Sequence, residues 1–108
     1  MKFGLNENTI EKLNRIFAAH PEVQYAILYG SRAKGNHKHN SDIDMSLKGE
    51  DINLDVLNQI SLEIDDLLMP YMIDLSIFTH IKNDELIDHI KRVGKVFYER
   101  KVATSLSS

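Results

Sequence analysis

Three aspartates and a glycine-serine pair form a pattern that could bind a phosphorylated nucleotide together with metal ions. Gly30 and Ser31 end an apolar run, ten residues follow, and Asp42 and Asp44 then lie one residue apart. A third acid, Asp74, lies within a later apolar run. Carboxylate oxygens suit Mg²⁺ or Mn²⁺, and Mg²⁺ is commonly held by one or two carboxylates and by substrate phosphates. The pattern therefore suggests a nucleoside triphosphate and its divalent ions.

The residues around the glycine-serine pair can supply the contacts that a triphosphate needs. If a helical turn begins at Ser31, its free backbone N–H groups point at an anion, and Gly30 lets a phosphate approach the backbone. Arg32 and Lys34 are placed to add charge-assisted hydrogen bonds to phosphate oxygens, although both could equally be solvated loop charges. Gly30, Ser31, Arg32 and Lys34 are therefore the candidate nucleotide ligands.

Hydrophobic periodicity predicts the strands that position these groups. Residues 23–30 are apolar, β-branched and aromatic, which predicts a largely buried strand. A second strand at 42–47 alternates, so that both acids of the pair point to one face. A third strand at 71–78 places Asp74 among apolar neighbours, and residues 96–99 could form a short edge strand.

Three helices are predicted before and between these strands. Asn8 starts a capping box, which begins the first helix, at about residues 9–20. An apolar stripe over residues 54–68 predicts the second helix. The third helix is capped by Asn83 and terminated by Gly94.

The lengths of the connections predict how the strands pair. About ten residues join the first two strands, which is short for a parallel crossover, so these strands should be antiparallel neighbours. A helix joins the second strand to the third, which permits a right-handed parallel crossover. If the second and third strands pair in register, Asp74 lies beside Asp42 and Asp44. We predict an α/β fold, more closely α+β, with a small mixed sheet of three to four strands, helices packed on one face and the three carboxylates on the other.

Three neighbouring carboxylates need compensating charge. At an effective dielectric constant of about 20, two carboxylates about 4 Å apart repel each other by roughly 4 kcal/mol. Either their pKa values rise or a cation binds beside them. Two metal ions could lower the pKa of an attacking hydroxyl and stabilise the leaving oxygens of an in-line displacement.

Composition bounds the class of protein. At 108 residues the chain fits one small domain, at 1–102, followed by a polar tail at 103–108 that we expect to be frayed. The chain has no cysteine, which excludes disulfides and thiolate chemistry. No apolar run approaches the length of a membrane span and no secretory signal is evident, so we expect a cytoplasmic protein without a membrane partner. The net charge of −3 argues against DNA as a partner.

Histidines and one tyrosine near this pattern have simpler interpretations. His37 and His39 lack a third ligand for zinc, so loop solubility or partner contact is favoured. Tyr29 either fills the sheet or stacks on a base. The other histidines are expected only to cap helices or to be solvated: His20, His80 and His89.

The arrangement of Gly30-Ser31, Asp42-Ile43-Asp44 and Asp74 resembles the polymerase-β-like nucleotidyltransferase superfamily. Within it, residues 30–47, GSRAKGNHKHNSDIDMSL, look most like the minimal nucleotidyltransferases (MNT) of bacteria and archaea. These are the antitoxin half of HEPN/MNT toxin-antitoxin pairs. The resemblance covers nearly the whole chain.

The resemblance implies roles for the matching residues. Gly30 and Ser31 would contact the β and γ phosphates, Asp42 and Asp44 would ligate Mg²⁺, and Asp74 would complete the metal site and help to activate the incoming hydroxyl. The implied reaction transfers AMP from ATP to a tyrosine of a HEPN ribonuclease toxin encoded nearby, releases pyrophosphate and silences the toxin. A second chain would supply the acceptor, so a hetero-oligomer is expected and a homodimer is possible.

Two other functions remain open on the sequence. The chain could be a binding module that neutralises its partner by complex formation without chemistry. It could also transfer a nucleotide to RNA or to a small molecule with a helper subunit. The acceptor, the nucleotide preference and the oligomeric state are not specified by the sequence.

Overall fold

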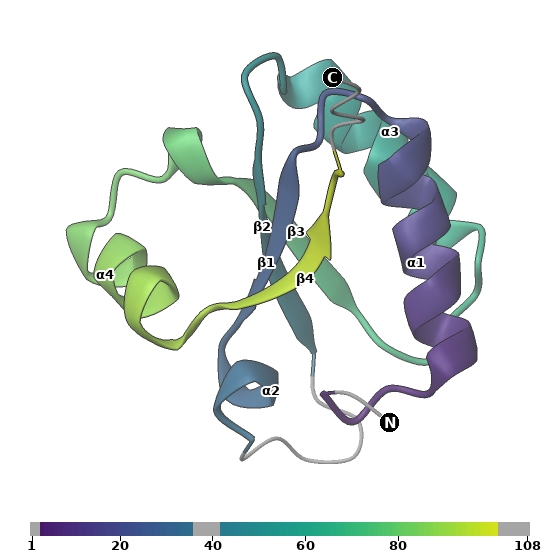
Figure 1. Ribbon diagram of the computed structural model, residues 1–108, viewed down its shortest axis with the longest axis horizontal. Coiled ribbons are helices and arrows are strands. Elements are labelled where there is room, and N and C mark those ends of the chain that lie inside the picture. The colour runs from purple at the N-terminus through teal and green to yellow at the C-terminus, as the bar shows by residue number, and fades with distance from the viewer. Residues whose placement is uncertain (1–2, 36–41, 102–108) are drawn as a thin grey trace, which may run out of the picture.

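The computed structural model of the chain describes residues 3–35 and 42–101. The elements along these residues are α1 (Glu7–Ala19), β1 (Tyr25–Tyr29), α2 (Ser31–Lys34), β2 (Ile43–Lys48), α3 (Leu54–Asp65), β3 (Ile73–Ile77), the 3₁₀ turn η1 (Phe78–His80), α4 (Asp84–Val93) and β4 (Lys95–Glu99) (Figure 1). The predictions for His37 and His39 lie outside the described residues. The predicted domain limits, at 102 and at 103–108, stay predictions for the same reason.

The sheet has the strand order β3-β2-β1-β4. β1 pairs antiparallel with β2, and Tyr29 lies opposite Asp44. β2 pairs parallel with β3, and Asp44 lies opposite Asp74. β4 pairs antiparallel with β1 and forms one edge of the sheet. The predicted mixed sheet, the pairing of its first three strands and the edge strand near the C-terminus are confirmed.

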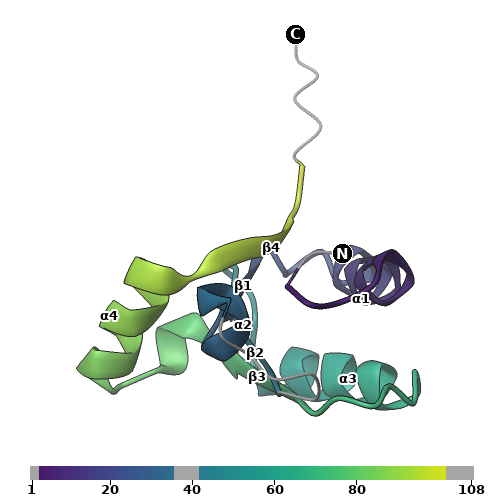
Figure 2. The same cartoon turned by 90° about the horizontal axis from the view of Figure 1, so that it is seen from below.

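An apolar core lies between one face of the sheet and the helices α1 and α3 (Figure 2). Alternate residues of a strand point to the same face, so each strand contributes every second side chain to this core. Fully burying a large apolar side chain contributes about 1.5–3 kcal/mol to the free energy of unfolding, and these contributions stabilise the packing of α1 and α3 on the sheet. The fully buried core side chains from α1, β1, β2 and α3 are Leu13, Phe17, Ala26, Leu28, Ile43, Met45, Leu47 and Ile60.

Helix α4 lies on the other side of the sheet from α1 and α3 (Figure 2). Helix α4 contacts β1. The end of α4 lies close to this strand at Gly94, where an added Cβ would lie 2.7 Å from Cγ2 of Ile27. The expectation that the helices share one face therefore holds for α1 and α3 but not for α4. Because α1 and α3 already fill the core face, the connection from β3 to β4, at opposite edges of the sheet, crosses the second face.

The helix caps agree with the sequence at one helix and differ at another. The side chain of Asn83 accepts hydrogen bonds from the first turn of α4, as predicted. For α1 the cap is Asn6, whose Oδ1 accepts a hydrogen bond of 2.8 Å from the Thr9 N–H, so the prediction of Asn8 was wrong. Glu11, which a capping box would turn back toward Asn8, instead pairs with the next turn of the helix. Among the described residues, no helix has the length and apolar character needed to cross a membrane.

Candidate active site

The predicted carboxylates meet at one end of the sheet, on the face that α1 and α3 leave uncovered. Asp44 lies directly opposite Asp74 in the parallel register, and Asp42 immediately precedes β2. A hydrogen bond of 2.9 Å from the Ile43 N–H to the Met72 carbonyl oxygen holds the register at this end. Asp42 and Asp74 are exposed, whereas Asp44 is partly buried. The structure therefore brings the three acids to one open surface.

Electrostatics at Asp44 show that these carboxylates interact. Burial is the largest cause that raises the pKa of Asp44, and the negative charges of Asp74 and Asp42 raise it further. A positive charge on His89 would act in the opposite direction and lower the pKa of Asp44. The ionised form of Asp44 is therefore destabilised by its neighbours, and a cation placed beside it would relieve that repulsion.

The oxygen donors of this site fit a hard divalent cation in their chemistry. Within residues 3–35 and 42–101, no three acidic or histidine side chains already form a cluster that could hold a metal ion. Mg²⁺ usually takes only one or two protein carboxylates and completes its shell with substrate phosphates and water. The chemistry of Asp42, Asp44 and Asp74 fits a site of this kind, and their role as metal ligands stays a prediction.

The glycine-serine turn packs directly on Asp44. Gly30 has φ = +78° and precedes the single helical turn α2, which begins at Ser31. The turn is closed by hydrogen bonds from the Lys34 N–H to the Gly30 oxygen, 3.1 Å, and from the Gly35 N–H to the Ser31 oxygen, 3.0 Å. A Cβ added to Gly30 would lie only 2.6 Å from Oδ2 of Asp44. Only glycine permits both this backbone conformation and this approach.

The two basic residues of the turn lie in different environments. Arg32 is 2% exposed, its guanidinium donates a hydrogen bond of 2.8 Å to the Phe3 carbonyl oxygen, and it lies 4.9 Å from the ring centroid of Tyr71. Arg32 thus ties α2 to the N-terminal segment and to the residues before β3. Lys34, in contrast, is exposed at the end of α2. Phosphate contacts by Arg32 and Lys34 stay predictions.

Two further residues complete the surroundings of the site. Tyr29 is 9% exposed, and its pKa is raised mainly by burial, with further increases from Asp44 and Asp74 against a hydrogen bond with Ser76 that lowers it. His89 on α4 reaches the turn, since its Nε2 accepts a hydrogen bond of 3.3 Å from the Gly30 N–H. The interpretation of His89 as a capping or solvated residue was wrong. No spacing in the sequence signals this contact, because it joins residues 59 positions apart.

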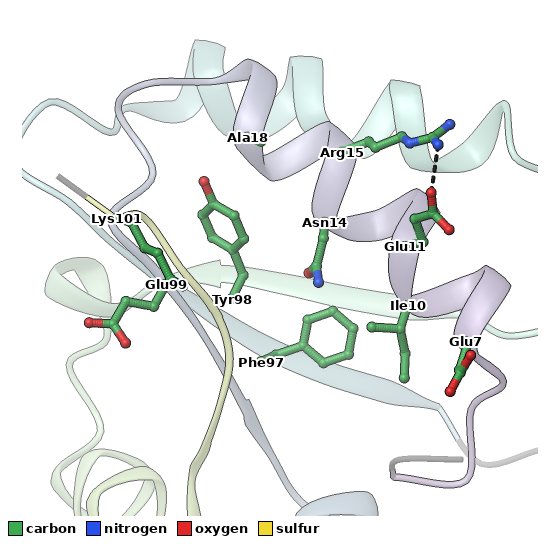
Figure 3. A pocket seen from close by; sticks show the side chains of 10 residues that line it. All are labelled: Glu7, Ile10, Glu11, Asn14, Arg15, Ala18, Phe97, Tyr98, Glu99 and Lys101. Carbon is green, nitrogen blue, oxygen red and sulfur yellow. Dashed lines mark hydrogen bonds and ion pairs between the residues drawn. The ribbon is translucent and has the colours of Figure 1, made fainter. Parts of the chain in front are cut away.

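A cavity of about 650 Å³ lies between α1 and β4 (Figure 3). The side chains of Ile10, Phe97 and Tyr98 form part of its wall. None of the residues predicted for nucleotide or metal binding lines this cavity. The candidate active site is instead the open surface formed by the acids and the glycine-serine turn.

A mixed sheet that sets paired acids beside a glycine-serine turn defines a class of nucleotidyltransferases. Residues 11–103 match the family described as polymerase beta, nucleotidyltransferase. The chain therefore belongs to the polymerase β nucleotidyltransferase family. The comparison with curated proteins gave no significant match.

Several similar solved structures are described as toxin-antitoxin complexes. One, described as a toxin-antitoxin with AMP-PNP, contains a chain that is 26% identical with a TM-score of 0.66, and the match covers 90% of this chain and 76% of that chain. A chain of the MntA-HepT toxin-antitoxin is 18% identical with a TM-score of 0.64, and the match covers 88% of this chain and 74% of that chain. A third structure is described as a tri-AMPylated Shewanella oneidensis HEPN toxin in complex with MNT antitoxin. Its matching chain is 23% identical with a TM-score of 0.60, and the match covers 91% of this chain and 73% of that chain.

Proposed function

We propose that this protein is a Mg²⁺-dependent nucleotidyltransferase that transfers AMP from ATP to a tyrosine hydroxyl of a HEPN toxin and acts as the antitoxin. The observation that carries this proposal is the register at one end of the sheet. It sets Asp44 opposite Asp74 and against the Gly30 turn. A phosphate chain resting on the turn would therefore lie beside the carboxylates that hold its metal ions.

Each predicted residue has a place in this reaction. Asp42, Asp44 and Asp74 would hold two Mg²⁺ ions, or Mn²⁺, while Gly30 and Ser31 would contact the β and γ phosphates. Bound metal ions would lower the pKa of the acceptor hydroxyl and neutralise charge on the leaving pyrophosphate. The acceptor oxygen forms a bond to the α-phosphorus, the bond from that phosphorus to the bridging oxygen of the β-phosphate breaks, and the hydroxyl proton passes to the Asp74 carboxylate.

Two observations support a protein acceptor brought by a second chain. Asp42 and Asp74 are exposed, which suits a site that accepts a large substrate. The neighbour at 26% identity is a toxin-antitoxin complex that contains AMP-PNP, which supports both a nucleotide and a protein partner. We therefore propose a cytoplasmic hetero-oligomer with the toxin. Tyrosine as the acceptor follows from the family resemblance of residues 30–47.

The test is a transfer assay with the partner encoded beside this protein. The purified chain, Mg²⁺ and ATP labelled at the α-phosphate should label a tyrosine of the HEPN protein. Asp44→Asn and Asp74→Asn should abolish the labelling, because each removes a charged metal ligand. Asp51→Asn is the matched control, since Asp51 is an exposed turn residue outside the site, and it should label normally.

The alternative functions predict different results in the same experiments. A binding module without chemistry would give no labelling, and an Asp42→Asn/Asp44→Asn variant would still suppress toxicity in cells. A transferase for RNA would label RNA but not the partner protein. Either result would overturn the proposed protein adenylyltransferase.

A further inference from the structure

Helix α4 reaches the candidate active site through one partly buried side chain, His89. Its Nε2 accepts the hydrogen bond of 3.3 Å from the Gly30 N–H, and its ring stands edge-on to Tyr29, with centroids 6.1 Å apart and planes at 82°. To accept this hydrogen bond, Nε2 must carry no proton, so the ring proton of the neutral imidazole lies on Nδ1. The imidazole thus contacts the Tyr29 ring while its acceptor nitrogen is directed at one backbone group.

Gly30 is held from two sides at this point. The Asp44 carboxylate lies against its α-carbon, where a Cβ would come within 2.6 Å of Oδ2, and His89 binds its N–H. With φ = +78°, Gly30 occupies a backbone region in which glycine has several alternatives nearby. A hydrogen bond to the N–H fixes the peptide plane before Gly30 and so fixes where the Ser31 turn begins.

The helix that carries His89 is anchored well enough to act as a support. Ile90, the next residue, is 3% exposed. At the end of the helix Gly94 lies so close to Ile27 of β1 that a Cβ would come within 2.7 Å of Cγ2. His89 therefore links the glycine-serine turn to an element that is packed on the same strand, β1, from which the turn leaves.

We propose that His89 is a positioning residue of the nucleotide site, which holds Gly30 in the conformation that receives the triphosphate. This inference rests on the proposed function, because it assigns His89 to the same phosphate-binding turn. His89 acts through Gly30 and does not itself touch the reacting atoms. It also keeps the Gly30 N–H occupied, so that the N–H groups that donate to phosphate at the turn come from residues after Gly30, while Gly30 lets the phosphate approach the backbone.

Three substitutions at this position separate the hydrogen bond from the bulk of the ring. His89→Ala removes the acceptor, His89→Gln places an amide oxygen near the position of Nε2, and His89→Asn carries the same amide on a side chain too short to reach. His80→Ala is the control, since His80 is an exposed histidine on η1. The affinity for Mg²⁺ with αβ-methylene ATP is measured by calorimetry, and the Gly30 amide is followed by its NMR shift and hydrogen-exchange rate.

We expect His89→Ala and His89→Asn to speed exchange of the Gly30 amide and to weaken nucleotide binding by about three- to tenfold, the loss produced by one hydrogen bond of about 0.6–1.4 kcal/mol. His89→Gln should restore most of the protection of the Gly30 amide and most of the nucleotide affinity. His80→Ala should change neither the exchange rate nor the affinity. If His89→Ala binds nucleotide as tightly as the wild type, the inference fails while the proposed function stands. Restoration of the melting temperature but not of affinity by His89→Gln would also overturn it. If the wild type binds no nucleotide, the inference and the proposed function fail together.

Discussion

Gly30→Ala tests whether the contact between the glycine-serine turn and Asp44 shapes the site. The added Cβ would lie 2.6 Å from Oδ2 of Asp44, whereas ordinary van der Waals contact begins near 3.4 Å. The Asp44 carboxylate must therefore move by about 0.8 Å, since the side chain is softer than the backbone of the turn. The substitution thus displaces a predicted metal ligand without changing its charge.

The size of the effect follows from two separate costs. A non-glycine residue in this region of φ and ψ costs on the order of 1–3 kcal/mol, which for a domain of this length lowers the melting temperature by roughly 5–15 °C. A misplacement of about 1 Å at a reacting centre can cost about 10²-fold in rate. We therefore expect AMP transfer to fall by about 10²-fold, equivalent to about 2.7 kcal/mol of transition-state stabilisation.

The chain offers a matched control in Gly35→Ala. Gly35 has φ = +83°, so alanine is strained there too, but nothing lies within 4 Å of its added Cβ. Both variants are compared in thermal unfolding and in the transfer assay. Gly35→Ala should lose stability of about 1 kcal/mol and keep its activity. The reasoning is refuted if Gly30→Ala retains transfer within about threefold of Gly35→Ala, because the displaced carboxylate would then be irrelevant to the site.

Two further substitutions test the charges around the site. Asp74→Asn removes one of the charges that raise the pKa of Asp44, so that pKa should fall in an NMR titration of the carboxyl carbon. A carboxyl group whose pKa is higher in the folded chain than in the unfolded chain favours the folded state below the unfolded-state pKa of about 3.9. That contribution to the free energy of unfolding is lost as the pH rises through the folded-state pKa. Metal-free Asp74→Asn should therefore be more stable than the wild type at pH 7 and equally stable below about pH 3. The gain at pH 7 should be less than about 1 kcal/mol, because the Asp44 and Asp74 carboxylates are partly or fully exposed. An unshifted Asp44 titration would contradict the interaction. Arg32→Ala should lower stability in urea by about 2–3 kcal/mol, because it removes a buried charge bonded to the Phe3 oxygen, whereas exposed Lys34→Ala should stay within about 0.5 kcal/mol. Equal stability with weakened nucleotide binding in Arg32→Ala would instead assign Arg32 to phosphate.

Local patterns in the sequence were enough to predict which side chains share a face. A strand alternates with a period of two whatever it pairs with, so Asp42 and Asp44 were expected on the same face before any neighbour was known. The connection lengths restricted the pairing to an antiparallel first pair and a parallel second pair, which placed Asp44 opposite Asp74. The structure confirms this part of the arrangement, and it is the part on which the family assignment and the proposed chemistry depend.

Contacts between distant parts of the chain could not be derived from such patterns. The sequence favoured neither phosphate contact nor a solvated loop charge for Arg32, but its side chain is buried and contacts the Phe3 oxygen and the Tyr71 ring. His89 looked like a surface residue of a helix, yet it reaches Gly30 because α4 crosses the second face of the sheet. Periodicity specifies the apolar side of an element but not the element that will cover it.

The sequence by itself therefore determined the composition of the site, since residue type, spacing and strand alternation are properties of short segments. The tertiary structure alone decided how the turn is supported, because the residues that hold Gly30 come from β2 and α4, and their approach depends on the packing of the whole sheet.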